Sequence, residues 1–127
     1  MEPRAKSSVL LIYTGGTIGM KPDPETGVLA PYDCSTIYDE FPYLGKLDVE
    51  LEVINLTPID SSNVTPELWC ELARLIRDNY DAYDGFVVLH GTDTMSYSAS
   101  ALSFMLVNLA KPVIFTGSQI PIGVLRT

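Results

Sequence analysis

The chain has 127 residues and a formal net charge of −8, from 16 acidic and 8 basic side chains. This excess of acid argues against nucleic acid or a membrane surface as a partner, because both are bound by clustered Lys and Arg. Hydrophobic residues make up 46% of the sequence and its mean hydropathy is +0.18, which is typical of a globular chain with a core. The sequence shows neither a secretory signal nor an apolar run approaching the ~20 residues of a membrane span, so we expect a cytoplasmic protein.

Four short apolar runs predict the strands of a sheet: residues 9–13, 49–56, 85–90 and 112–117. The first, third and fourth runs are nearly continuous, which is typical of strands that are buried on both faces. The second run alternates apolar with polar residues and suits a strand nearer an edge of the sheet.

Helical patterns lie between the later strands. Thr65, Pro66 and Glu67 resemble a helix start, with an N-cap, a proline at the first helical position and an acid in the first turn. A second helix is predicted from residue 95 to residue 109, where Pro112 would enforce its end, and a weaker one over residues 35–41. Alternating strands and helices predict a single α/β domain with a mostly parallel open sheet and flanking helices.

Two loops interrupt this alternation. Residues 20–31 contain three prolines and a glycine, which exclude a helix and favour a hairpin or a flexible lid. Residues 57–66 connect the second strand to its helix. The sequence stops soon after the fourth predicted strand, where a doubly wound sheet normally continues, so we expect a piece of a larger domain.

Metal ligands are scarce in this sequence. Cys34 and Cys70 are the only cysteines, and His90 is the only histidine. The cysteines have no C-x-x-C or zinc-like spacing, so we expect reduced, packed thiols and no metal site.

Polar residues gather where the predicted strands end, and the carboxyl ends of parallel strands are where open sheets bind ligands. All four ends are rich in hydroxyl groups and glycines, and two of them also carry a carboxylate. They read TGGT at 14–17, DSS at 60–62, HGTDT at 90–94 and TGSQ at 116–119. One such end is an ordinary turn, whereas four together predict a site for a small polar ligand.

The first strand end does not match a phosphate-binding loop. A G-x-G-x-x-G pattern needs a glycine at position 14, which is Thr14 here, and the loop must open a helix that holds the phosphates. Lys21 and Pro22 follow instead, which also argues against a flavodoxin-like phosphate loop. We therefore expect the glycines to let a ligand approach the backbone, without a cofactor.

Candidate catalytic residues lie at the same strand ends. Thr17 would present its hydroxyl to the crevice, but an alcohol is a weak nucleophile and needs a base. A Ser-His-Asp triad would have to use His90, yet no G-x-S-x-G elbow exists, and a lone histidine at a strand end is more often structural. Asp93 lies near a helix start, where the dipole favours a carboxylate, although Asp93 or Thr94 would also suit simple capping of that helix.

Together and in order, three segments resemble the bacterial L-asparaginase family, and its type I cytoplasmic branch in particular. They are YTGGTIGM at 13–20, DSSNVTPELW at 60–69 and YDGFVVLHGTDTMSYSASALSFMLVNLAKPVIFTGSQIP at 83–121. The resemblance covers nearly the whole chain. It implies a flavodoxin-like or Rossmann-like N-terminal domain and hydrolysis of L-asparagine to L-aspartate and ammonia, without metal or organic cofactor.

The resemblance also implies roles for individual residues. Thr17 would be the nucleophile that forms an acyl-enzyme, Thr92 would position or activate water, and Asp93 would hold the α-amino group of the substrate. Backbone N–H groups near residues 91–93 would stabilise the developing oxyanion. Four residues match the substrate-binding set: Asp60, Ser61, Ser62 and Gly91.

Two features depart from the family pattern. The family's loop tyrosine aligns with Val28, and Tyr32 follows four residues later. The family's catalytic lysine lies well downstream of TGSQ, and Lys111 is in the wrong position to match it. The resemblance thus implies that residues 1–127 are most of an N-terminal domain without the C-terminal domain, and that they do not turn over alone. It also implies a homodimer or homotetramer for the full-length protein, in which a neighbouring subunit completes the active site.

Two other functions stay open. An asparaginase-like subunit of a tRNA-dependent amidotransferase would feed ammonia to a partner, but that subunit usually has an extra N-terminal domain, whereas TGGT begins at residue 14 here. A non-catalytic amino-acid-binding domain would keep the pocket and lack the chemistry, and only the missing lysine supports it. L-Glutamine stays open as a second substrate.

Overall fold

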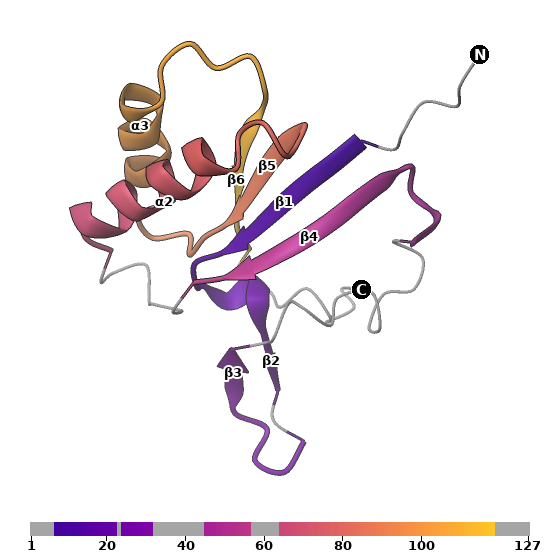
Figure 1. Ribbon diagram of the computed structural model, residues 1–127. Helices are drawn as coiled ribbons and strands as arrows, with labels where there is room; N and C mark the ends of the chain where they lie inside the picture. The colour runs from indigo at the N-terminus through magenta and orange to yellow at the C-terminus, as the bar shows by residue number, and fades with distance from the viewer. Residues whose placement is uncertain (1–6, 23, 32–44, 57–63, 119–127) are drawn as a thin grey trace.

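A parallel sheet forms the centre of the computed structural model, which describes residues 7–22, 24–31, 45–56 and 64–118. The strand order is β4-β1-β5-β6, and all three pairings are parallel. Helices α2 and α3 precede β5 and β6 respectively (Figure 1). The α/β class is therefore confirmed. The bounds are β1 Ser7–Tyr13, β4 Val49–Asn55, α2 Pro66–Asp78, β5 Gly85–Leu89, α3 Met95–Met105 and β6 Val113–Thr116.

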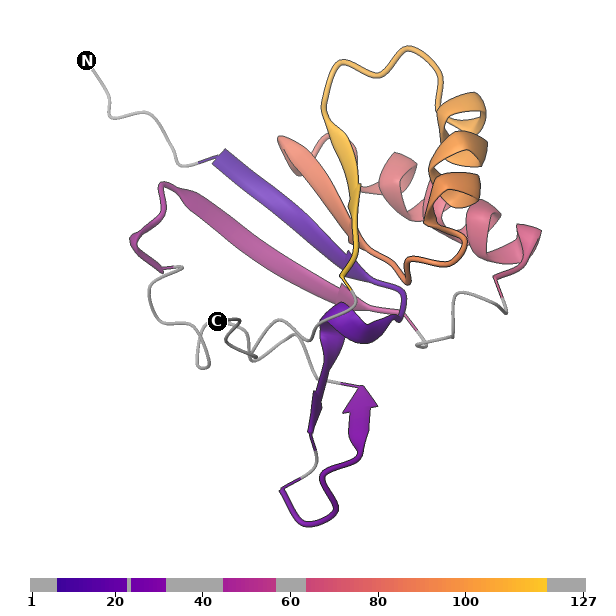
Figure 2. The ribbon, with the colours of Figure 1, turned by 180° about the vertical axis from the view of Figure 1, so that it is seen from behind.

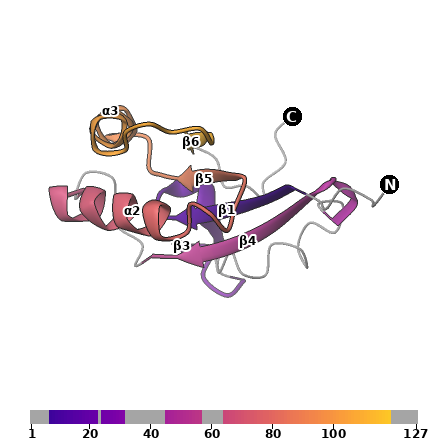
Figure 3. The same ribbon diagram turned by 45° about the horizontal axis from the view of Figure 1, so that its top comes forward.

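The main core lies between one face of the sheet and the two helices, which lie on the same side of it (Figure 3). Alternate residues of each strand point to this face, as the pleat requires. A smaller cluster on the opposite face contains Leu11, Tyr13 and Leu89. Strand β1 therefore buries side chains on both faces, as its continuous apolar run predicts. The main cluster consists of Leu10, Ile12, Leu68, Leu72, Ile76, Phe86, Val88 and Leu102.

The two outer strands of the described sheet differ in how well the sequence predicted them. Strand β4 lies beside β1 at one edge and alternates in exposure, as predicted. The prediction for residues 112–117 was wrong, because β6 forms the other edge and its Ile114 is 54% exposed. Ile114 pairs with Val87, on the face away from the helices. An apolar run alone does not distinguish a central strand from an edge strand.

Helix α2 begins as predicted, with Thr65 as N-cap and Pro66 at the first helical position. The end predicted for α3 was wrong, because the helix stops at Met105 and not at residue 109. Leu106 is extended, with φ −103° and ψ 106°, and Asn108 is left-handed, with φ 57°. The chain therefore leaves the helix well before Pro112, and a tertiary contact sets its path.

That contact is made by Tyr80, just after α2. Its hydroxyl oxygen accepts hydrogen bonds from the backbone N–H groups of Ala110 and Lys111, at 2.7 and 3.1 Å. The Lys111 ammonium donates to the Tyr80 carbonyl at 2.5 Å and lies 4.8 Å from the centre of the Tyr80 ring. The ring in turn stacks on Phe86, with 6.2 Å between centroids. Tyr80 thus fastens the α3–β6 connection to the core.

An antiparallel hairpin of β2 (Met20–Pro22) and β3 (Leu29–Pro31) confirms the hairpin predicted for residues 20–31. It projects beyond the carboxyl ends of the sheet strands in both views (Figures 1 and 2). The helix predicted over 35–41 lies outside the described residues. Among the helices that the structure describes, none combines the length and the apolarity needed to cross a membrane.

Replacing Tyr80 by Phe removes the acceptor for two backbone N–H groups but keeps the ring on Phe86. We expect Tyr80→Phe to lower the free energy of unfolding by about 1–2 kcal/mol in urea denaturation. Tyr97, which is 67% exposed on α3, provides the control, because Tyr97→Phe should change it by less than about 0.5 kcal/mol. Equal stabilities of the two variants would contradict the role given to Tyr80.

Candidate functional site

The carboxyl ends of β1, β5 and β6 are held together by hydrogen bonds that continue past the strands. The Thr14 amide donates to the Leu89 carbonyl at 3.0 Å, and the buried Thr14 hydroxyl donates to the same oxygen at 2.9 Å. The His90 amide donates to the Thr116 carbonyl at 3.0 Å. Three of the four polar strand ends predicted from the sequence therefore lie side by side.

Glycines bring these three loops into direct contact. Gly16 has a φ of +93°, and a Cβ atom placed on it would lie only 2.6 Å from the Gly91 Cα atom. A Cβ atom on Gly117 would overlap the His90 carbonyl oxygen and lie 3.2 Å from the Thr92 Cγ2 atom. A side chain at either position would separate the loops, so both glycines are needed for the close approach.

The segment after Gly16 is a short 3₁₀ turn, η1 (Thr17–Gly19), that leads directly into β2. It is not an α-helix, so this loop lacks the helix N-terminus that a phosphate site requires. The Tyr13 hydroxyl donates to the Gly16 carbonyl at 3.0 Å, and the Tyr13 ring fills the space where Gly19 would carry a Cβ. These contacts place the backbone of Thr17 at the carboxyl end of β1.

The loop after β5 becomes more exposed along its length. Gly91 is buried, Thr92 is half-buried and Asp93 is exposed. The N-cap of α3 is Thr94, which makes no side-chain capping hydrogen bond, and Asp93 comes one residue earlier. The Asp93 carboxylate therefore lies in solvent near a helix N-terminus, where the dipole favours negative charge.

His90 is buried, with 1% of its surface exposed, and forms part of a hydrogen-bonded chain. Its Nδ1 atom lies 2.7 Å from the Gly91 carbonyl oxygen and its Nε2 atom 2.9 Å from the Ser98 hydroxyl. The Trp69 indole N–H donates to the same Ser98 oxygen at 2.7 Å. Because a carbonyl only accepts, Nδ1 carries a proton, and in the neutral ring Nε2 accepts from Ser98. This network supports the structural interpretation of His90.

Other predicted residues are not brought into this picture. Asp60, Ser61, Ser62 and Tyr32 lie outside the described residues, as does the side chain of Thr17. Val28 lies just before β3 and is 65% exposed. Lys111 lies beside Tyr80, at the opposite end of β6 from Gly117.

Ser98 and Trp69 were not among the predicted site residues. The signal that identifies Ser98 is its place in α3, one helical turn before the buried Leu102. A serine at a core-facing position requires a hydrogen-bond partner, and His90 provides it.

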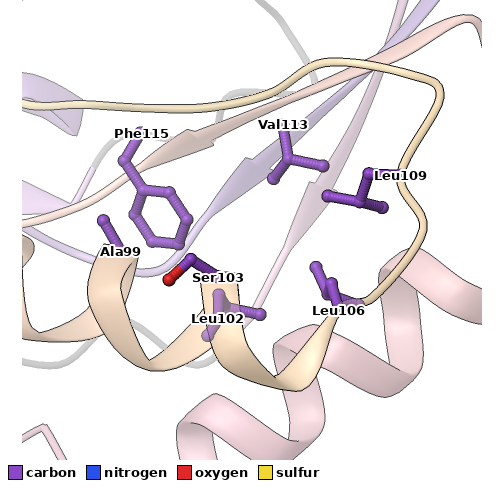
Figure 4. A pocket seen from close by; sticks show the side chains of 7 residues that line it. All are labelled: Ala99, Leu102, Ser103, Leu106, Leu109, Val113 and Phe115. Atoms are coloured by element: carbon purple, nitrogen blue, oxygen red, sulfur yellow. The ribbon is translucent and has the colours of Figure 1, made fainter.

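A shallow apolar groove of about 280 Å³ between α3 and β6 is a second candidate for a ligand (Figure 4). Ser103 is its only hydroxyl-bearing residue, and it has no charged group. A zwitterionic amino acid needs charged and polar partners, so the groove is poorly suited to such a ligand. Its lining residues are Ala99, Leu102, Ser103, Leu106, Leu109, Val113 and Phe115.

Comparison with known proteins agrees with this arrangement. The family model described as asparaginase, N-terminal, matches residues 8–127. L-asparaginase 1 of Escherichia coli is 48% identical over 124 residues, which are 96% of this chain and 37% of that protein. The crystal structure of L-asparaginase I from Vibrio cholerae superposes with a TM-score of 0.84 at 45% identity, again over 96% of this chain and 37% of the other. The chain thus spans little more than a third of these relatives.

A relative with a different name is a glutamyl-tRNA(Gln) amidotransferase subunit from Thermoplasma volcanium. It is 41% identical over 118 residues, which cover 90% of this chain and 28% of that protein. The similarity to it is lower than that to the E. coli protein.

Gly16 and Gly27 together separate the cost of backbone strain from the cost of lost contact. Both have positive φ, but an added Cβ on Gly27 would meet nothing within 4 Å. We expect Gly27→Ala to lower the free energy of unfolding by about 1 kcal/mol, and Gly16→Ala by about 3 kcal/mol because it also pushes the two loops apart. Urea denaturation measures both, and equal losses would show that the Gly16–Gly91 contact carries no weight.

Proposed function

This chain belongs to the asparaginase family, and on that premise we propose that the protein hydrolyses L-asparagine to L-aspartate and ammonia. The observation that carries the proposal is the contact between the TGGT and HGTDT loops, made at Gly16 and Gly91. It brings the two threonine-rich strand ends to one place at the carboxyl edge of the sheet. The substrate is a small zwitterion with a carboxamide side chain.

The proposed reaction begins at Thr17. Its hydroxyl oxygen attacks the carboxamide carbon, the C–N bond breaks, and ammonia leaves after taking up a proton. The resulting acyl-enzyme ester is hydrolysed by a water molecule that Thr92 positions, which releases L-aspartate and restores the hydroxyl. Backbone N–H groups near residues 91–93 stabilise the negative charge on the carbonyl oxygen in both steps.

Substrate recognition is proposed to rest on charge complementarity. The Asp93 carboxylate binds the α-ammonium group, and its position next to the N-cap of α3 supports a negatively charged side chain there. Asp60, Ser61, Ser62 and Gly91 complete the proposed substrate-binding set, with Ser61 and Ser62 contacting the α-carboxylate. Neither a metal nor an organic cofactor takes part in this scheme.

The proposed active site extends beyond these 127 residues. We propose that they form most of the N-terminal domain of a longer protein, since relatives of this family are nearly three times as long. The family's lysine, which would assist proton transfer at the threonine, lies in the later part. We further propose that the full-length protein is a cytoplasmic homodimer or homotetramer.

A role as the ammonia-releasing component of a tRNA-dependent amidotransferase is the second candidate. The similarity to the amidotransferase protein of Thermoplasma volcanium supports it. The higher identity to E. coli L-asparaginase 1 favours free L-asparagine as the substrate, with L-glutamine as the weaker one.

Thr17→Ala in the full-length protein tests the nucleophile. We expect the rate of ammonia release from L-asparagine to fall by about 10³-fold or more, because no hydroxyl remains to form the ester. The matched variant Thr17→Ser keeps the hydroxyl and should retain a measurable rate. Full activity in Thr17→Ala would remove Thr17 from the mechanism, and no release by the wild-type protein would overturn the function itself.

The 127-residue chain tests the need for the downstream lysine. We expect it to release no ammonia under conditions in which the full-length protein turns over, because the hydroxyl of Thr17 then lacks a base. Circular dichroism establishes that the short chain is folded before its activity is assayed. Comparable turnover by the two proteins would show that the lysine is dispensable.

A further inference from the structure

We propose that Ser98 and Trp69 are positioning residues, which act through His90 to set the orientation of the Gly91–Thr92 peptide at the active site. The proposal rests on the proposed function, since that peptide supplies one of the N–H groups for the oxyanion. It extends that function to two helical residues that are not in the predicted site.

The first step is the hold on the Gly91 carbonyl. His90 Nδ1 donates to it at 2.7 Å, from a ring with only 1% of its surface exposed. The described peptide bonds are all trans, so the Gly91 C=O and the Thr92 N–H point in opposite directions from the same rigid plane. By fixing the carbonyl, His90 therefore fixes the direction of the Thr92 N–H.

The second step is the hold on the His90 ring. Ser98 is fully buried, and its hydroxyl lies 2.9 Å from the His90 Nε2 atom. The Trp69 N–H donates to this hydroxyl at 2.7 Å, which leaves the hydroxyl proton to point at Nε2. With Nε2 acting as the acceptor, the ring proton stays on Nδ1, where the Gly91 carbonyl needs it.

The third step is the anchoring of the chain in rigid elements. Trp69 lies in α2 and Ser98 in α3, and both helices pack on the main core through Leu72 and Leu102. The network thus ties a loop at the site to two packed helices. Catalytic donors lose much of their effect when they are misplaced by a fraction of an ångström, so such an anchor bears on rate more than on substrate affinity.

Kinetics of the full-length protein separate positioning from a merely structural role. In Ser98→Ala we expect kcat for L-asparagine to fall about tenfold while KM changes less than about twofold, because oxyanion donors act mainly on the transition state. Ser100→Ala is the matched control, since it makes the same change at an exposed position on the same helix and should leave both constants unchanged. Trp69→Phe, which keeps an aromatic ring, should lower kcat in the same direction by a smaller factor.

Nuclear magnetic resonance provides a readout that does not depend on turnover. We expect the His90 ring to carry its proton on Nδ1 in the wild-type protein, and the amide signals of Gly91 and Thr92 to shift in Ser98→Ala but not in Ser100→Ala. Unmoved amide signals, a proton on Nε2, or equal kcat values in the two serine variants would overturn the positioning role. Absence of ammonia release by the wild-type protein, with the amide shifts present, would overturn the proposed function and leave the network intact.

Discussion

The close approach of two backbones, at Gly16 and Gly91, is the constraint on which the candidate site depends. No side chain fits between them, because a Cβ on Gly16 would lie 2.6 Å from the Gly91 Cα atom. The contact places the loops after β1 and β5 against each other, and Gly117 brings the loop after β6 to the same place. The geometry of this contact is by itself sufficient to require glycine at positions 16 and 117.

The sheet gives each of its faces a different task. One face carries the main core, in which α2 and α3 cover alternate side chains of the strands. The other carries the smaller cluster around Tyr13, whose ring and hydroxyl hold the turn that contains Thr17. The hydrophobic effect thus stabilises the molecule from one side, and directed polar contacts shape the site at the carboxyl edge.

The hydrogen-bonded chain from Trp69 to Gly91 shows how the core and the site are connected. Its members come from α2, α3 and the end of β5, and the side-chain polar atoms that form it are all paired. A buried network that is fully satisfied holds one arrangement, because any other would leave a polar atom without a partner in a dry interior. The only histidine of the sequence is therefore explained by geometry, without a part in proton transfer.

Much of this protein can be predicted from the amino-acid order because the signals are local. The apolar runs, the Thr65–Pro66 helix start and the proline-rich hairpin each depend on neighbours in the chain, and each formed as predicted. The motifs at the strand ends also pointed to the family. The end of α3, the edge position of β6 and the partners of His90 depend on residues far away in sequence. Tyr80 bonds to residues 30 and 31 positions later, and Trp69 to a serine 29 positions later. Local sequence thus determined the elements and their order, whereas only tertiary packing decided where α3 ends and which side chains hold the site, since those contacts exist only after the chain has folded.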